Sequence, residues 1–160
     1  MASVVYCIVL LCLTSGLWME AEAKRDCSGS CRHGWTRYDC RCFIFRHYEM
    51  NWATAERHCI GLGGNLASIR STSEYYHIRQ LVRSATGTNR NVWVGGNDGI
   101  WEGWWMWSDG SRFSFNHWRS GEPNNYHGKE DCMEMNFRGG DSVNDADCRD
   151  KINFVCSSSY

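Results

Sequence analysis

The distribution of cysteines restricts the fold of this chain more than any other feature. Of its 10 cysteines, Cys7 and Cys12 lie in an apolar stretch at the beginning, and the others are Cys27, Cys31, Cys40, Cys42, Cys59, Cys132, Cys148 and Cys156. An even set of cysteines in a secreted chain indicates a disulfide framework, although counting alone does not give the pairing. A zinc site is disfavoured because no C-x₂-C or H-x₃₋₅-H pair has the usual spacing.

The first residues predict secretion. The apolar run Val4–Leu13 leads to Ala21-Glu22-Ala23, which has the small-x-small pattern of a signal-peptide cleavage site. This run is too short to cross a bilayer as a helix, and no later segment reaches that length, so no membrane span is expected. We therefore expect a signal peptide at 1–23, a short segment at 24–30 and one extracellular domain at 31–160.

Composition limits the classes of partner. The 17 Lys and Arg residues nearly balance the 18 Asp and Glu residues, so the chain lacks the basic surplus that nucleic-acid binding requires. A length of 160 residues suits one compact domain better than two.

Periodicity predicts two helices near the start of this domain. Apolar residues at i, i+3 and i+7 over 51–59 indicate a helix that ends at Gly61, Gly63 and Gly64. A second helix is predicted from about Ser73 to Arg83, preceded by the capping-box spacing of Ser71 and Glu74. Short strands are expected near 42–45, 92–94, 104–107 and 153–156, with a strand or extended link at 66–69. Two early helices followed by short strands and long polar loops indicate an α+β fold.

One polar stretch gathers oxygen ligands. Glu122, Asn124, Glu130 and Asp131 lie along a single loop, and the pair Asn144-Asp145 precedes a cysteine further on. Carboxylate and amide oxygens in this mixture suit Ca²⁺, which takes about 6–8 oxygen ligands, better than they suit zinc.

These motifs resemble the C-type lectin-like domain from Cys31 to Cys156, which is nearly all of the presumed mature chain. Small secreted lectins of fish mucus and serum, lactose-binding ones among them, share this compact layout. The matching segments are Gly34-Trp35, Cys42-Phe43, Trp52–Cys59, Gly64–Ile69, Trp93-Val94-Gly95, Glu102–Gly110, Trp118, Glu122-Pro123-Asn124, Glu130-Asp131-Cys132, Asn144-Asp145, Cys148 and Phe154-Val155-Cys156.

The resemblance implies two helices flanking short antiparallel sheets, with long loops that carry calcium and sugar. It also implies three disulfides, which are Cys31–Cys42, Cys59–Cys156 and Cys132–Cys148. Cys27 and Cys40 are left over, and they can pair with each other or cross-link two chains into a homodimer.

For the site, the resemblance implies that Glu122, Asn124, Glu130, Asn144 and Asp145 hold Ca²⁺ and bind two adjacent sugar hydroxyls. Glu122 and Glu130 accept hydrogen bonds from these hydroxyls, Asn124 and Asn144 donate to them, and a cis Glu122-Pro123 peptide orients the loop. The alternative is an ordinary acidic turn. A second calcium position is suggested by Asp98, Glu102, Asn125 and Asp131, against the alternative of solvated loop carboxylates. Many members have aspartate where this chain has Asn125.

Two features complicate the choice of sugar. In this family Glu-Pro-Asn accompanies mannose-type sugars, whereas Tyr126 could stack on galactose or be a loop aromatic without a ligand. Val143 replaces the family's tryptophan ahead of Asn144, and the spacing from Cys132 is longer than in many members. Calcium-independent lactose or galactose binding therefore stays an alternative.

The sequence predicts a secreted, calcium-dependent lectin that binds glycans on microbial or cell surfaces, in innate defence or agglutination. A second hypothesis is a member of the fold that binds no sugar, such as an antifreeze protein. An enzyme is not expected, because no nucleophile with a base partner and no open zinc site is apparent.

Overall fold

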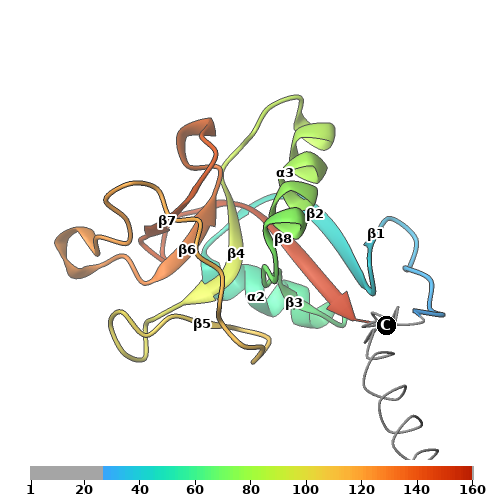
Figure 1. Cartoon of the computed structure of the whole chain (residues 1–160), viewed down its shortest axis with the longest axis horizontal. Helices are drawn as coiled ribbons and strands as arrows, with labels where there is room; N and C mark the ends of the chain where they lie inside the picture. Colours follow the sequence, from blue (N-terminus) through green and yellow to red (C-terminus); the bar gives the residue numbers. More distant parts are fainter. Residues whose placement is uncertain (1–26, 160) are drawn as a thin grey trace, which may run out of the picture.

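The computed structural model describes residues 27–159. The signal peptide expected at 1–23 lies outside this range. The elements, labelled in Figure 1, are β1 (Thr36–Tyr38), β2 (Arg41–Met50), α2 (Trp52–Gly61), β3 (Asn65–Leu66), α3 (Thr72–Thr86), β4 (Val92–Asn97), β5 (Met106–Trp107), β6 (Cys132–Met135), β7 (Val143–Ala146) and β8 (Ile152–Ser159), with one-turn 3₁₀ helices at Tyr126–Gly128 and Phe137–Gly139.

Both predicted helices are present, and local hydrogen bonds explain where they begin. The side chain of Asn51 accepts from the backbone N of Thr54 at 2.9 Å, and that of Ser71 accepts from the backbone N of Glu74 at 3.1 Å. Each bond satisfies an amide that a helix start leaves unpaired. Helix α3 ends at Gly87, whose left-handed φ of 75° suits a residue without Cβ.

The capping box at the start of α3 forms only in part. Glu74 does not reach back to Ser71. Its carboxylate accepts from the backbone N of Arg70 at 2.6 Å and pairs with the guanidinium of Arg41 at 2.7 Å. Arg41 belongs to β2. Glu74, for which the sequence indicated only a role in capping α3, therefore also joins this helix to the sheet.

The strands form one sheet within the described residues, in the order β1-β2-β8-β4-β6-β7, with β3 beside β8 and β5 beside β4. The pairings are antiparallel except that of β4 with β8, which is parallel and joins the expected short antiparallel sheets into one. Of the strand predicted at 104–107, only Met106–Trp107 pairs with β4.

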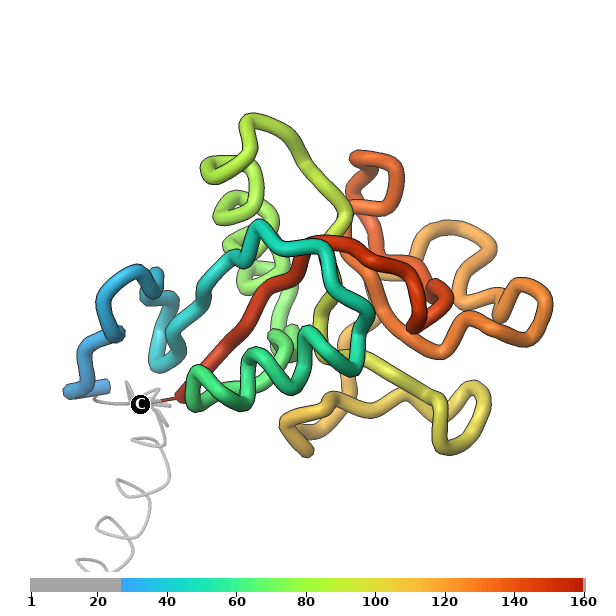
Figure 2. The backbone as a smooth tube through the Cα atoms, turned by 180° about the vertical axis from the view of Figure 1, so that it is seen from behind, coloured from blue at the N-terminus to red at the C-terminus, as the bar shows by residue number. Residues whose placement is uncertain are grey.

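The two helices cover opposite faces of the sheet, as Figures 1 and 2 show from the front and from behind. Alternate residues of β4 explain this arrangement, because side chains alternate between the faces of a strand. Val92 and Val94 pack with Tyr75 of α3, whereas Trp93 packs with Ala55 of α2. The domain therefore has a core on each face.

Four disulfides close the framework: Cys27–Cys40, Cys31–Cys42, Cys59–Cys156 and Cys132–Cys148. Cys59–Cys156 joins α2 to β8, and Cys132–Cys148 joins the segments that flank the polar loops. Because Cys27 pairs with Cys40 within the chain, neither is left to link two chains covalently.

Candidate functional site

The polar loop between β5 and β6 is anchored to strand β7 by one buried carboxylate. Asp145 is 1% exposed, and its carboxylate accepts from the backbone N of Asn124 at 3.0 Å and from that of Asn125 at 2.6 Å. The peptide between Glu122 and Pro123 is cis. The site is thus held by a strand of the sheet rather than by the loop alone.

The carboxylates of Glu122, Glu130 and Asp145 lie close together where the loop meets β7. Burial, followed by the neighbouring charges of Asp145 and Glu130, raises the pKa of Glu122. Burial and Asp145 likewise raise the pKa of Glu130, against a hydrogen bond from the backbone N of Tyr126 at 2.9 Å. Like charges placed together favour protonation or a bound cation.

The two amides of the predicted set lie beside these carboxylates. The Nδ2 of Asn124 donates to Glu122. Asn144 is buried in β7, and its Nδ2 donates to the backbone O of Asp145 and, at 3.2 Å, to Oε1 of Glu134. The five residues Glu122, Asn124, Glu130, Asn144 and Asp145 are therefore brought to one place by the fold.

This donor set fits a hard divalent cation. It combines three carboxylates with two amides, and none of the three carboxylates has an ion pair with Lys or Arg among the described residues. Within 27–159, no three His, Cys, Asp or Glu side chains form a metal-holding cluster by themselves. Asparagine oxygens, of which the set has two, are common ligands of Ca²⁺ and unusual ones of zinc.

The second predicted set also comes together, on the loop after β4. The backbone N of Asp98 donates to the backbone O of Asp131 at 3.1 Å, and Nδ2 of Asn125 donates to Glu102. Asp98 is fully buried with Oδ1 lacking a partner in the described part of the chain, and burial raises the pKa of its carboxyl. A buried carboxylate oxygen without a partner is costly, so it is a fitting ligand for a second cation.

Aromatic residues on the same loops divide into two groups. Trp107 is buried, and Trp105 packs against Trp118 with ring centroids 4.7 Å apart. Trp101 and Tyr126 are 72% and 63% exposed. Tyr126 lies against His127, with ring centroids 4.0 Å apart, and remains open to solvent.

Comparison with known sequences supplies the family. The family described as the Lectin C-type domain matches residues 48–158, which include both helices and both polar loops. The chain belongs to the C-type lectin domain family. The long loops of this C-type lectin domain project from one side of the molecule, away from β1 and the end of β8 (Figure 2).

Individual relatives agree with this membership. The galactose-specific lectin nattectin of Thalassophryne nattereri is 43% identical over 157 residues, with 98% of both chains covered. Ladderlectin of Oncorhynchus mykiss is 43% identical over 81% of this chain and 68% of its own. Among solved structures, herring type II antifreeze protein superposes with a TM-score of 0.75 at 28% identity, covering 81% of this chain and 99% of its own.

Sequence reasoning missed one residue that contacts the candidate site. Glu134 lies opposite Asn144 in the pairing of β6 with β7. Its carboxylate accepts from Nδ2 of Asn144 and, at 2.9 Å, from Nδ2 of Asn91. Glu134 is 4% exposed, so it orients Asn144 from beneath. A charged residue in the otherwise apolar strand Cys132–Met135 was the only available signal.

Proposed function

We propose that the chain is a secreted lectin that holds Ca²⁺ with Glu122, Asn124, Glu130, Asn144 and Asp145 and binds neutral saccharides there. One observation supports the proposal: among residues 27–159 the carboxylates of Glu122, Glu130 and Asp145 lie close together without an ion pair to Lys or Arg, and the amides of Asn124 and Asn144 lie beside them. A cation relieves the repulsion among the carboxylates.

The residues around the ion suit a pair of sugar hydroxyls. A hydroxyl donates one hydrogen bond and accepts up to two. Glu122 and Glu130 act as acceptors, and Asn124 acts as a donor from its Nδ2 atom. Asn144 contributes its Oδ1 to the ion; the donor role expected for it does not fit, because both protons of its Nδ2 are directed to Glu134 and the backbone O of Asp145. Bound Ca²⁺ supplies a hard Lewis acid that attracts the hydroxyl oxygens. Glu134 holds the amide of Asn144, so that its donor and acceptor atoms keep fixed directions.

Two observations on the choice of sugar point in different directions. Glu-Pro-Asn at 122–124 favours a mannose-type ligand by family resemblance. The exposed ring of Tyr126 close by, and a galactose-specific relative at 43% identity, favour galactose or lactose. The proposed ligand is therefore a neutral hexose with vicinal hydroxyls. Mannose and lactose are tested in parallel in the experiment below.

Secretion and glycan partners belong to the same proposal. The apolar leader and four disulfides suit an oxidising, extracellular compartment. No helix in the described part of the chain is long and apolar enough to cross a membrane. Glycans on microbial or cell surfaces are the proposed targets, and family membership assigns the chain to binding domains rather than to enzymes.

Affinity chromatography tests the proposal. The protein is applied with CaCl₂ to mannose and lactose columns, and each is then washed with EDTA. Wild type and Glu49→Gln, which changes an exposed glutamate of β2, should be retained on at least one column and released by EDTA. Glu122→Gln should flow through both.

Two results would contradict this function. Retention that neither EDTA nor Glu122→Gln disturbs would show that the sugar is held away from the proposed calcium site. Flow-through of the wild type on both columns, together with thermal hysteresis in an ice-growth assay, would favour an antifreeze function, like that of the herring type II protein, instead.

A further inference from the structure

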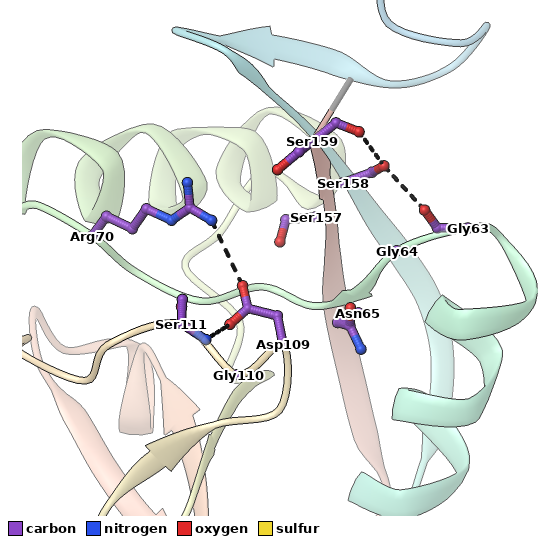
Figure 3. Close-up of a pocket in the computed structure, with 10 residues that line it drawn as sticks. All are labelled: Gly63, Gly64, Asn65, Arg70, Asp109, Gly110, Ser111, Ser157, Ser158 and Ser159. Atoms are coloured by element: carbon purple, nitrogen blue, oxygen red, sulfur yellow. Dashed lines mark hydrogen bonds and ion pairs between the residues drawn. The ribbon is translucent and has the colours of Figure 1, made fainter.

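A polar cavity of about 400 Å³ lies beside Ser157–Ser159, at the end of β8. It is formed where β3, the end of β8 and the turn after β5 meet (Figure 3). Its lining includes Asn65, Arg70, Asp109, Ser111 and Ser157 and contains no aromatic ring. This volume lies within the range of small-molecule sites, about 300–1,000 Å³, at its lower end.

A buried ion pair lies next to Ser157, one of the residues that line this cavity. Arg41 pairs with Glu74 and donates from its second terminal nitrogen to Oγ of Ser68 at 2.9 Å and to Oγ of Ser157 at 2.6 Å. Both charged residues are buried, and breaking such a pair is costly, so the arrangement is rigid. The hydroxyl of Ser157 is thereby fixed at the cavity wall.

Asp109 is fixed in the same way. Its Oδ2 accepts from Oγ of Ser68 at 2.5 Å, and its Oδ1 accepts from the backbone N of Ser111 at 2.9 Å. Figure 3 shows its carboxylate facing the guanidinium of Arg70 across the cavity. The closest N···O distance between them is 3.8 Å, which is longer than a hydrogen bond.

Two sets of donors therefore remain available to a ligand. The side chain of Arg70 is 45% exposed and donates no hydrogen bond within residues 27–159. Ser157 accepts from Arg41, and its own hydroxyl proton has no acceptor in the described structure. Acceptors are also present, because a carboxylate has about four lone-pair sites and Asp109 uses only part of them.

The charges select the class of ligand. Arg41 and Arg70 are balanced by Glu74 and Asp109, so the cavity has no surplus charge to hold an anion or a cation. A neutral hydroxyl can accept from Arg70 and donate to Asp109, and the 3.8 Å separation leaves the pair free to do both. We propose that this cavity is a second, calcium-independent saccharide site.

A second site would explain how one chain could cross-link cells. All eight cysteines of the described residues are paired within the chain, so none of these eight is left to link two chains and provide avidity. Two separate sites would let a single chain bridge two glycans. This bridging depends on the function proposed above, whereas binding at the cavity does not. Without an aromatic platform, we expect the cavity to bind sugar weakly.

The test is a titration of ¹⁵N-labelled protein with lactose or methyl mannoside in EDTA, followed by NMR. We expect saturable shifts of the backbone amides of Gly63, Gly64 and Gly110. Arg70→Ala should weaken this binding at least tenfold. Arg83→Ala, on the exposed surface of α3, is the matched control and should behave as wild type.

Three outcomes would overturn the proposal: no shifts at these amides, shifts that persist in Arg70→Ala, or shifts produced by sodium sulfate and not by either sugar. A separate titration with CaCl₂ reports on the amides of 122–131. Failure of the cavity and failure of the calcium site can therefore be distinguished in the same sample.

Discussion

Replacing Glu134 with alanine should weaken calcium binding although this residue is not a proposed ligand. Its carboxylate accepts from the amides of Asn91 and Asn144 at 2.9 and 3.2 Å. In the variant both amides lose a buried acceptor, at a cost of about 1–3 kcal/mol for each. Asn144 would then rotate to satisfy its NH₂ group, and its oxygen would leave the site.

Supporting residues of this kind typically change metal affinity by about 10–100-fold, so we expect a loss of that size for Glu134→Ala. The free energy of unfolding is a less direct readout. Removing a buried charge is itself stabilising, and this gain offsets part of the loss from the broken hydrogen bonds. Burial raises the pKa of Glu134, which shows that its charge is costly to bury.

Isothermal titration calorimetry with CaCl₂ measures this effect. Glu49→Gln controls for a change of charge on the surface, and Asn91→Ala removes one partner of Glu134 while leaving Asn144 in place. We expect wild-type affinity for Glu49→Gln and a smaller loss for Asn91→Ala than for Glu134→Ala. Wild-type calcium affinity in a folded Glu134→Ala protein, checked by circular dichroism, would refute the positioning role.

Three further predictions follow from the same loops. Asn125→Asp adds a charge beside the second set of ligands, so calorimetry should show a tighter second calcium site; unchanged stoichiometry and affinity would count against that site. Because the pKa values of Glu122 and Glu130 are raised, these carboxyls take up protons at a higher pH than ordinary glutamates. In the apo protein these two carboxyls therefore stabilise the fold most when the pH is below the ordinary pKa of glutamate. This stabilisation is lost as the pH rises through their raised pKa values. The increase in Tm caused by calcium should accordingly be largest near neutral pH and fade on acidification, and a pH-independent increase would contradict this. Trp107→Ala should cost about 3–5 kcal/mol of unfolding free energy, whereas Trp101→Ala should stay within about 0.5 kcal/mol; equal losses in denaturant titrations would show that the exposed ring is structural.

Local signals in the sequence were sufficient for the helices. The apolar spacing in 51–59 and the cap at Ser71 depend on neighbours within one or two turns, and both helices begin where these signals place them. The family resemblance added what local patterns lack, because it brings together oxygen ligands that lie more than 20 residues apart.

Contacts across the sheet could not be predicted in this way. Glu74 has the spacing of a capping box, yet the buried guanidinium of Arg41 draws its carboxylate toward β2. Glu134 meets Asn144 only through the register of β6 with β7. The cavity beside Arg70 requires segments from four parts of the chain, so no single stretch indicates it.

The most direct test of the central claim is a crystal structure of the protein grown with CaCl₂ and either lactose or methyl mannoside. We predict an ion bounded by oxygens of Glu122, Asn124, Glu130, Asn144 and Asp145, with two adjacent sugar hydroxyls against it. An empty site at saturating calcium, with the oxygen of Asn144 turned away from Glu122, would contradict the account even if the protein agglutinated cells.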